Sequence, residues 1–158
     1  MREILFRAKR EATNEWVYGY FVKEYYDFLI YVQPQIITQS GREYVNENTL
    51  GQFTGLTDKN GVKIFEGDII TFEDVCCEGG SGYEYPDEWA VETMNRVEVV
   101  IRNGCVCFGK ELFETSAYED IQSYYPNLNE WFAECAEVIG NIYDNPELIV
   151  SVEKNEEE

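Results

Sequence analysis

Cysteines and carboxylates are the side chains that could carry chemistry in this chain of 158 residues, because it contains no histidine. Without histidine, neither a Ser-His-Asp triad, a Cys-His pair nor a histidine-ligated zinc site can form. The 31 Asp and Glu residues could supply paired carboxylates for acid–base catalysis. With so many, some pairs lie close by chance, so proximity alone would not identify an active site. We therefore expect no catalytic residue and no enzyme activity.

Five cysteines could bind a metal or take part in redox chemistry: Cys76, Cys77, Cys105, Cys107 and Cys135. Cys105 and Cys107 stand on a predicted strand, where alternate side chains share one face. Structural zinc sites, however, usually place about two to four residues between paired cysteines. An adjacent pair and a C-x-C pair do not fit this spacing, so we expect no metal and no cofactor. The odd number of cysteines, with no visible signal peptide, indicates reduced thiols.

Acidic residues are distributed unevenly along the chain. Residues 1–60 hold eight acids and seven bases, a net charge of −1, whereas residues 61–158 hold 23 acids and five bases, a net of −18; together these give −19. Seven acids occur without a base over residues 73–92 and form a candidate partner surface: Glu73, Asp74, Glu78, Glu84, Asp87, Glu88 and Glu92. Direct binding to nucleic acid is not expected, because phosphate contacts need Lys and Arg.

Three uses of this acidity remain open. It could attract a basic surface on another protein, since opposite charges speed encounter. It could also mimic nucleic acid and occupy the groove of a DNA- or RNA-binding protein. It could simply keep the protein dispersed in solution. Mimicry requires carboxylates at phosphate-like spacing in space, which a sequence does not reveal.

The elements that would position these groups are short β-strands separated by turns. Asp58-Lys59-Asn60-Gly61 predicts a type I turn closed by a glycine in the left-handed region. The run at 62–65 alternates like a half-buried strand, and residues 68–72 favour a strand after the break at Glu66-Gly67. Strands this short predict an all-β or mostly β fold, as a small barrel or a strongly bent antiparallel sheet.

Further strands are expected at residues 4–9, 16–23, 28–33, 51–56 and 137–143. Asn103-Gly104 is the preferred two-residue type I′ turn, so the segments around it, 96–101 and 105–108, should form a hairpin. Ser116 and Glu119 fit a capping box, which predicts a short helix over residues 117–124. We expect one or two short helices in all, and a core that includes Trp16, Leu56, Phe65 and Ile69.

Several of these motifs together resemble the YopX family of small phage and prophage proteins. Met1–Ala8 and Glu15–Tyr20 are similar to the start of that family. Gly51-Gln52-Phe53-Thr54-Gly55-Leu56-Thr57-Asp58-Lys59-Asn60-Gly61 and the following Ile64–Ile70 are similar to its central block, and Val138–Leu148 to its closing block. The resemblance covers nearly the whole chain in the expected order. It implies phage origin and a mostly β fold, and it implies no known reaction.

The length is that of one domain, which we place at residues 1–152, with an acidic insertion at 73–93 and a disordered acidic tail at 153–158. No apolar run approaches the roughly 20 residues of a membrane span, and we expect a location in the cytoplasm of the host bacterium. The 24 aromatic residues are compatible with self-association.

These observations lead to the hypothesis of a non-enzymatic phage or prophage protein that acts through protein–protein contact as a homo-oligomer. Besides itself, its possible partner is a basic protein of the host or the phage. The alternative is an acidic inhibitor that mimics nucleic acid and occupies the groove of a host DNA- or RNA-binding protein.

Overall fold

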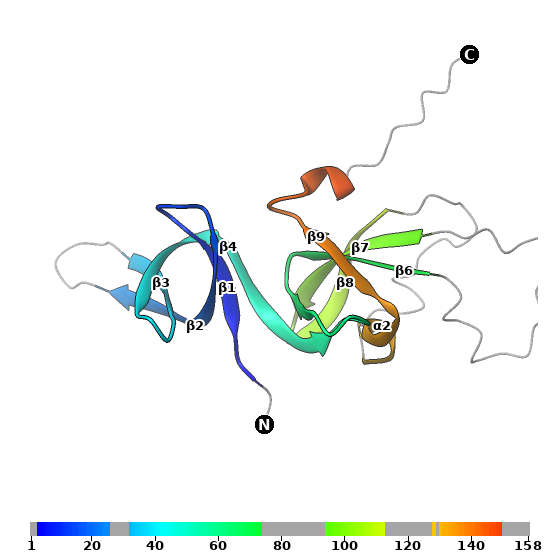
Figure 1. Cartoon of the computed structure of the whole chain (residues 1–158), viewed down its shortest axis with the longest axis horizontal. Coiled ribbons are helices and arrows are strands. Elements are labelled where there is room, and N and C mark those ends of the chain that lie inside the picture. The colour runs from blue at the N-terminus through cyan, green and yellow to red at the C-terminus, as the bar shows by residue number, and fades with distance from the viewer. Residues whose placement is uncertain (1–2, 26–31, 74–93, 113–127, 129, 150–158) are drawn as a thin grey trace, which may run out of the picture. The chain divides into compact units, whose positions relative to one another are not determined.

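The computed structural model describes residues 3–25, 32–73, 94–112, 128 and 130–149 (Figure 1). Within these residues the protein is mostly β, as predicted. The elements, in chain order, are β1 (Phe6–Arg10), β2 (Trp16–Tyr25), β3 (Val32–Ile37), β4 (Arg42–Thr57), β5 (Lys63–Phe65), β6 (Asp68–Glu73), β7 (Met94–Arg102), β8 (Cys105–Leu112), α2 (Glu130–Cys135), β9 (Glu137–Asn141) and the 3-10 helix η3 (Pro146–Ile149).

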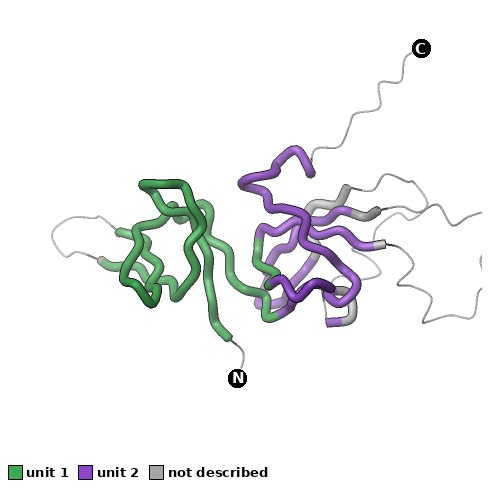
Figure 2. The backbone as a smooth tube through the Cα atoms, viewed as in Figure 1, with its two compact units in different colours: residues 1–55, 63–66 green, residues 56–62, 67–158 purple. Residues whose placement is uncertain are grey.

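The chain divides into two compact units (Figure 2). Unit 1 comprises residues 1–55 and 63–66, and unit 2 comprises residues 56–62 and 67–158. Two compact units can still fold together, so the single domain over residues 1–152 stays a prediction. The predicted insertion, apart from Glu73, and the predicted tail lie outside the described residues.

Unit 1 contains a small closed barrel, which confirms the predicted fold. Strands β1, β2, β3 and β4 pair in that order, and β4 pairs back onto β1; β5 adds to β4. The pairs around the ring are antiparallel. One cluster fills the interior with the buried residues Ala8, Val17, Ile36 and Val45, against which Phe6, Phe21 and Leu50 pack.

The seam between β1 and β4, where the barrel closes, is irregular. The register of the pairing shifts between Arg7 and Lys9. At this point the Lys9 N–H donates to the Thr49 hydroxyl at 2.8 Å, and that hydroxyl donates to the Asn46 carbonyl at 2.7 Å. The buried Thr49 side chain therefore satisfies a backbone donor that the shifted ladder leaves without a carbonyl.

Unit 2 contains an antiparallel sheet with the strand order β8-β7-β6-β9. Its buried residues include Ile69, Ile70 and Phe72 of β6 and Val97 and Val99 of β7. The predicted β7–β8 hairpin is confirmed. Asn103 and Gly104 form its two-residue turn, with φ angles of 52° and 79°. Beyond β8, the Leu128 N–H donates to the Val106 carbonyl at 2.9 Å.

The predicted turn at Asp58–Gly61 is confirmed as well. The Gly61 N–H donates to the Asp58 carbonyl at 2.9 Å, and Gly61 has a φ of 79°. The buried Asp58 carboxylate accepts the N–H groups of Asn60 and Val62 on Oδ1, both at 2.8 Å, and that of Val138 on Oδ2 at 3.0 Å. The carboxylate thus closes its own turn and also holds that turn against β9.

Several predicted boundaries need correction. The described part of the third strand is Val32–Ile37, so it continues four residues past the predicted end at 33, while residues 28–31 of that prediction lie outside the described residues. Strand β4 begins at Arg42 rather than at residue 51. The residues before position 51 are mostly polar, and their pairing with β3 and β1 makes them a strand despite their composition. The last strand ends at Asn141, two residues earlier than predicted.

The core and helix predictions have mixed outcomes. Phe65 and Ile69 are buried as expected, whereas Trp16 and Leu56 are only half-buried. The described helix is α2, which we did not predict. The helix predicted at 117–124 lies outside the described residues.

Candidate interaction surface

The predicted acidic surface is placed only at its first residue. Glu73 is the last residue of β6 and pairs with Met94 of β7. The other six members of the set lie outside the described residues: Asp74, Glu78, Glu84, Asp87, Glu88 and Glu92.

The cysteines that the structure describes are free thiols. Cys105 is exposed, and Cys107 and Cys135 are half-buried. The Cys107 thiol donates to the Cys105 carbonyl at 3.6 Å. Within the described ranges, no three His, Cys, Asp or Glu residues are placed to hold a metal ion.

Charge divides between the two units. Unit 1 has eight acids and seven bases, a net of −1. Unit 2 has the remaining 23 acids and five bases, a net of −18. One unit is therefore close to neutral, while the other carries nearly all of the negative charge.

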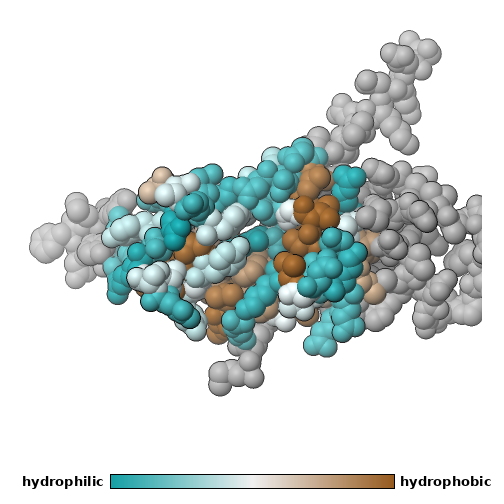
Figure 3. Space-filling view, in the orientation of Figure 1, coloured by the Kyte–Doolittle hydropathy of each residue, from teal (hydrophilic) through white to brown (hydrophobic). Residues whose placement is uncertain are grey.

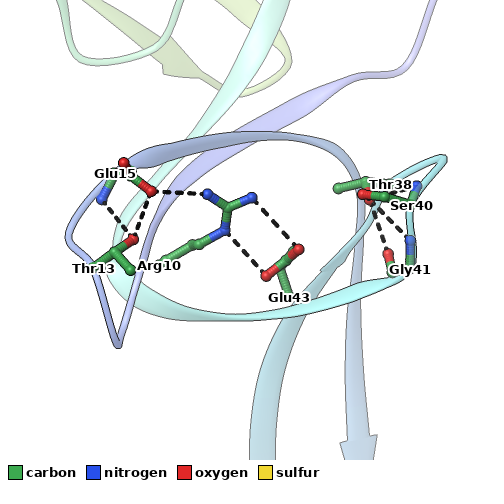
Figure 4. Close-up of polar contacts among 7 residues, drawn as sticks. All are labelled: Arg10, Thr13, Glu15, Thr38, Ser40, Gly41 and Glu43. Atoms are coloured by element: carbon green, nitrogen blue, oxygen red, sulfur yellow. Dashed lines mark hydrogen bonds and ion pairs between the residues drawn. The ribbon is translucent and has the colours of Figure 1, made fainter.

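Salt bridges neutralise much of the charge on unit 1. Arg10, at the end of β1, forms a two-pronged contact with Glu43 of β4, at 3.0 and 3.4 Å, and a third bond with Glu15 at 3.1 Å (Figure 4). The hydrogen bond that Arg10 donates to Glu43, together with the negative charges of Glu43 and Glu15, raises the pKa of Arg10 above its ordinary value. Further pairs join strands or termini: Lys23–Glu47, Arg42–Glu24 and Lys63–Glu3.

A hydroxyl organises the turn that leads into β4. The N–H groups of Ser40 and Gly41 donate to the Thr38 hydroxyl oxygen at 3.1 and 3.2 Å, and Thr38 in turn donates to the Gly41 carbonyl at 3.1 Å (Figure 4). The turn is thus held by its own side chain, which fixes the pairing of β3 with β4 that follows.

Two further cations are buried under aromatic rings. The Arg7 guanidinium lies 4.7 Å from the Trp16 ring centre and 4.9 Å from that of Phe65, and the Lys9 ammonium lies 5.5 Å from Trp16. Phe65 also packs on Phe53, with ring centres 5.5 Å apart. These contacts attract the cations to the ring faces and hold β5, through Phe65, against the barrel.

Three tyrosines stand exposed on the outside of the barrel: Tyr18 and Tyr20 on β2 and Tyr44 on β4, with exposed fractions of 49%, 65% and 51%. Tyr18 and Tyr20 alternate along one strand and so share a face. Gln35 of β3 pairs with Val22 of β2 and with Tyr44, which puts Tyr44 on that face as well. We call the outward side of β2, β3 and β4 with these three residues the tyrosine face.

Ring packing and polar contacts between strands support the tyrosine face. The Tyr18 ring packs on Phe65, with ring centres 5.6 Å apart. The buried Gln35 side chain donates to Glu24 at 3.4 Å, and Glu24 binds Arg42, so one polar chain links β3, β2 and β4. No donor among the described residues reaches Gln35 Oε1. The tyrosines are therefore presented by a braced sheet.

Unit 2 also exposes apolar residues. Figure 3 shows a stripe of hydrophobic residues over β9, bordered by hydrophilic ones. Ile139 of β9 is 37% exposed. This stripe belongs to the unit with a net charge of −18, which distinguishes it from the tyrosine face.

Sequence reasoning identified the surplus of aromatic residues but not this face. Trp16, Tyr18 and Tyr20 recur at every second position of a predicted strand, and that spacing could have placed them together. Tyr44 carried no such signal, because its place depends on the pairing of β3 with β4.

The chain belongs to the YopX family, since residues 5–150 match the family described as YopX protein. This confirms the resemblance found in the sequence. No curated protein matches the chain. Among solved structures, it is similar to the crystal structure of protein EF1440 from Enterococcus faecalis, with 22% identity and a TM-score of 0.45 over 95% of this chain and 100% of that one. No described helix is long and apolar enough to cross a membrane.

Proposed function

We propose that this YopX-family protein is a non-enzymatic phage or prophage protein that acts by protein–protein contact in the cytoplasm of the host bacterium and associates with itself. The tyrosine face is the observation that carries the proposal. Three tyrosines, each about half exposed or more, share one side of a small braced barrel. Tyrosine is enriched at protein interfaces, because its ring buries apolar area while its hydroxyl forms a hydrogen bond.

A second candidate function is favoured by the charge of unit 2. A net of −18 would attract a basic protein surface and could occupy the groove of a host DNA- or RNA-binding protein as a mimic of nucleic acid. The working surface would then centre on residues 73–92.

Co-purification from the bacterial host separates the two functions. The tagged full-length protein would be recovered at moderate and at high salt, beside two variants. One carries Tyr18→Ser, Tyr20→Ser and Tyr44→Ser. The other carries the neutralising changes Glu73→Gln, Asp74→Asn, Asp87→Asn and Glu88→Gln.

Contact through the tyrosine face predicts partners that persist at high salt and are lost in the tyrosine variant. Mimicry predicts a nucleic-acid-binding protein that dissociates at high salt, because exposed charge pairs are screened, and that is lost in the neutralised variant. Partners that survive the tyrosine changes and not the neutralising ones would replace the first function with the second.

A further inference from the structure

We infer that the tyrosine face is the surface through which two copies of this chain pair. The inference rests on the proposed self-association and adds where it occurs and what occupies the surface. Tyr18, Tyr20 and Tyr44 would lie at the centre of a two-fold interface, with the ion pair Arg42–Glu24 beside them.

The net charges of the two units favour unit 1 as the place where two copies pair. Pairing through unit 2 would bring together two units that each carry a net charge of −18. Like charges that face each other across an interface strongly disfavour association. Unit 1 has a net of −1, and its described cations Arg10, Lys23, Arg42 and Lys63 are held by carboxylates of the same unit. The tyrosine face therefore carries little charge to repel a second copy.

The chemistry of tyrosine suits a surface that meets itself. In a two-fold interface each residue faces the same patch on the other copy, so the patch must be complementary to itself. A row of carboxylates fails this condition, because it meets only carboxylates. A phenol hydroxyl both donates and accepts a hydrogen bond, and aromatic rings pack on one another, so tyrosines satisfy it.

The geometry of the face keeps the cost of ordering low. Tyr20 and Tyr44 stand on the strands that flank β3, two strand spacings or about 10 Å apart across the sheet. They are offset by two residues along the strands, because Tyr20 pairs with Ile37 and Tyr44 with Gln35. Tyr18 is already packed on Phe65. Side chains that are held on paired strands lose less freedom on binding than those on a loop.

The test is sedimentation velocity of the full chain over about 1–100 µM, a range that resolves weak pairing. We expect a concentration-dependent dimer. Tyr20→Glu should raise its Kd at least about tenfold, because the two-fold axis brings two added carboxylates together. Ile139→Glu is the matched control: it adds the same charge at an exposed position of β9 in unit 2, and it should leave Kd within about twofold.

The salt dependence of the dimer Kd is an independent test. If two nearly neutral faces meet, the repulsion between the two acidic units opposes pairing at long range. Added NaCl screens this repulsion and should therefore lower Kd. Pairing between an acidic surface and the cations of another copy would instead weaken as salt rises. A Kd that rises with salt would overturn the inference.

The remaining outcomes separate this inference from the proposed function. A dimer broken by Ile139→Glu and not by Tyr20→Glu refutes the tyrosine face while self-association stands. A monomer at every concentration refutes the inference altogether. In that case the salt-resistant partners and their loss in the triple tyrosine variant still decide whether the protein acts by contact.

Discussion

Asp58 shows how one buried side chain joins distant parts of unit 2. Its carboxylate accepts three backbone N–H groups, two from its own turn and one from Val138, which lies 80 positions further along the chain. These three donors replace the hydrogen bonds to water that the carboxylate loses on burial.

Replacement of Asp58 by Asn should destabilise the protein by about 1–3 kcal/mol, since the new amide nitrogen faces the Val138 N–H and leaves a buried donor unsatisfied. Asp58→Ala should lower the free energy of unfolding further, because all three N–H groups then lose their acceptor. Urea unfolding followed by circular dichroism measures both. Glu134→Gln, at an exposed position of α2, is the control and should change little. Equal stability of Asp58→Asn and the wild type would show that the Val138 contact contributes nothing.

The turn around Asp58 was predictable and its long-range role was not. Asp58 and Gly61 specify a turn through their own backbone preferences, which act within four residues. The bond to Val138 depends on where β9 packs, and no local preference encodes that position.

At the scale of elements, the barrel depends on the seam between β1 and β4. Because the register shifts there, the Lys9 N–H donates its hydrogen bond to the Thr49 hydroxyl instead of to a backbone carbonyl of β4. The same hydroxyl donates to the Asn46 carbonyl, so one side chain satisfies two groups at the place where the ring closes.

Thr49→Val should therefore lower the free energy of unfolding by about 1–3 kcal/mol, because it keeps the shape and removes the hydroxyl. Thr49→Ser keeps the hydroxyl and should retain most of the stability. Thermal unfolding of the two variants side by side measures the difference. If the serine variant is as unstable as the valine variant, the lost methyl group, and not the hydroxyl, accounts for the effect.

The elements were predicted best where local signals were strong. The β7–β8 hairpin follows from Asn103-Gly104, since this pair adopts the positive φ angles that a tight turn requires. The first half of β4 was missed, because its residues are polar on average and only Val45 and Thr49 are buried. Its strand state comes from pairing with β3 and β1, which is a property of the fold.

At the scale of the whole molecule, the chain passes between the two units three times. Unit 1 takes β5 from a segment that lies between two parts of unit 2. A fragment of residues 1–55 would lack Phe65, which covers Arg7 and Tyr18. Neither unit is a continuous piece of sequence, which favours folding as one domain.

We therefore expect a single cooperative transition in calorimetry. Thr49→Val changes unit 1 and Asp58→Ala changes unit 2, so each marks one unit. Both should shift the same transition to lower temperature if the units unfold together. Two resolved transitions, each moved by only one of the variants, would instead establish two independently folding domains.

The tyrosine face could be predicted only in part, because strand pairing in the fold determines one of its three residues. The spacing of Tyr18 and Tyr20 is visible in the sequence, whereas Tyr44 joins them through the order of strands in the barrel. The division of charge between the units was visible in outline, because the acids concentrate after residue 60.

The contacts of Asp58 and Leu128 also limit how unit 2 can associate. β8 and β9 are the outer strands of its sheet, and their outward backbone groups are where a foreign strand would add. The Asp58 turn occupies the N–H of Val138 and, through the Lys59 N–H, the carbonyl of Ala136; Leu128 occupies the carbonyl of Val106. An incoming strand would have to displace these bonds, so at these positions the two outer strands resist the addition of a foreign strand.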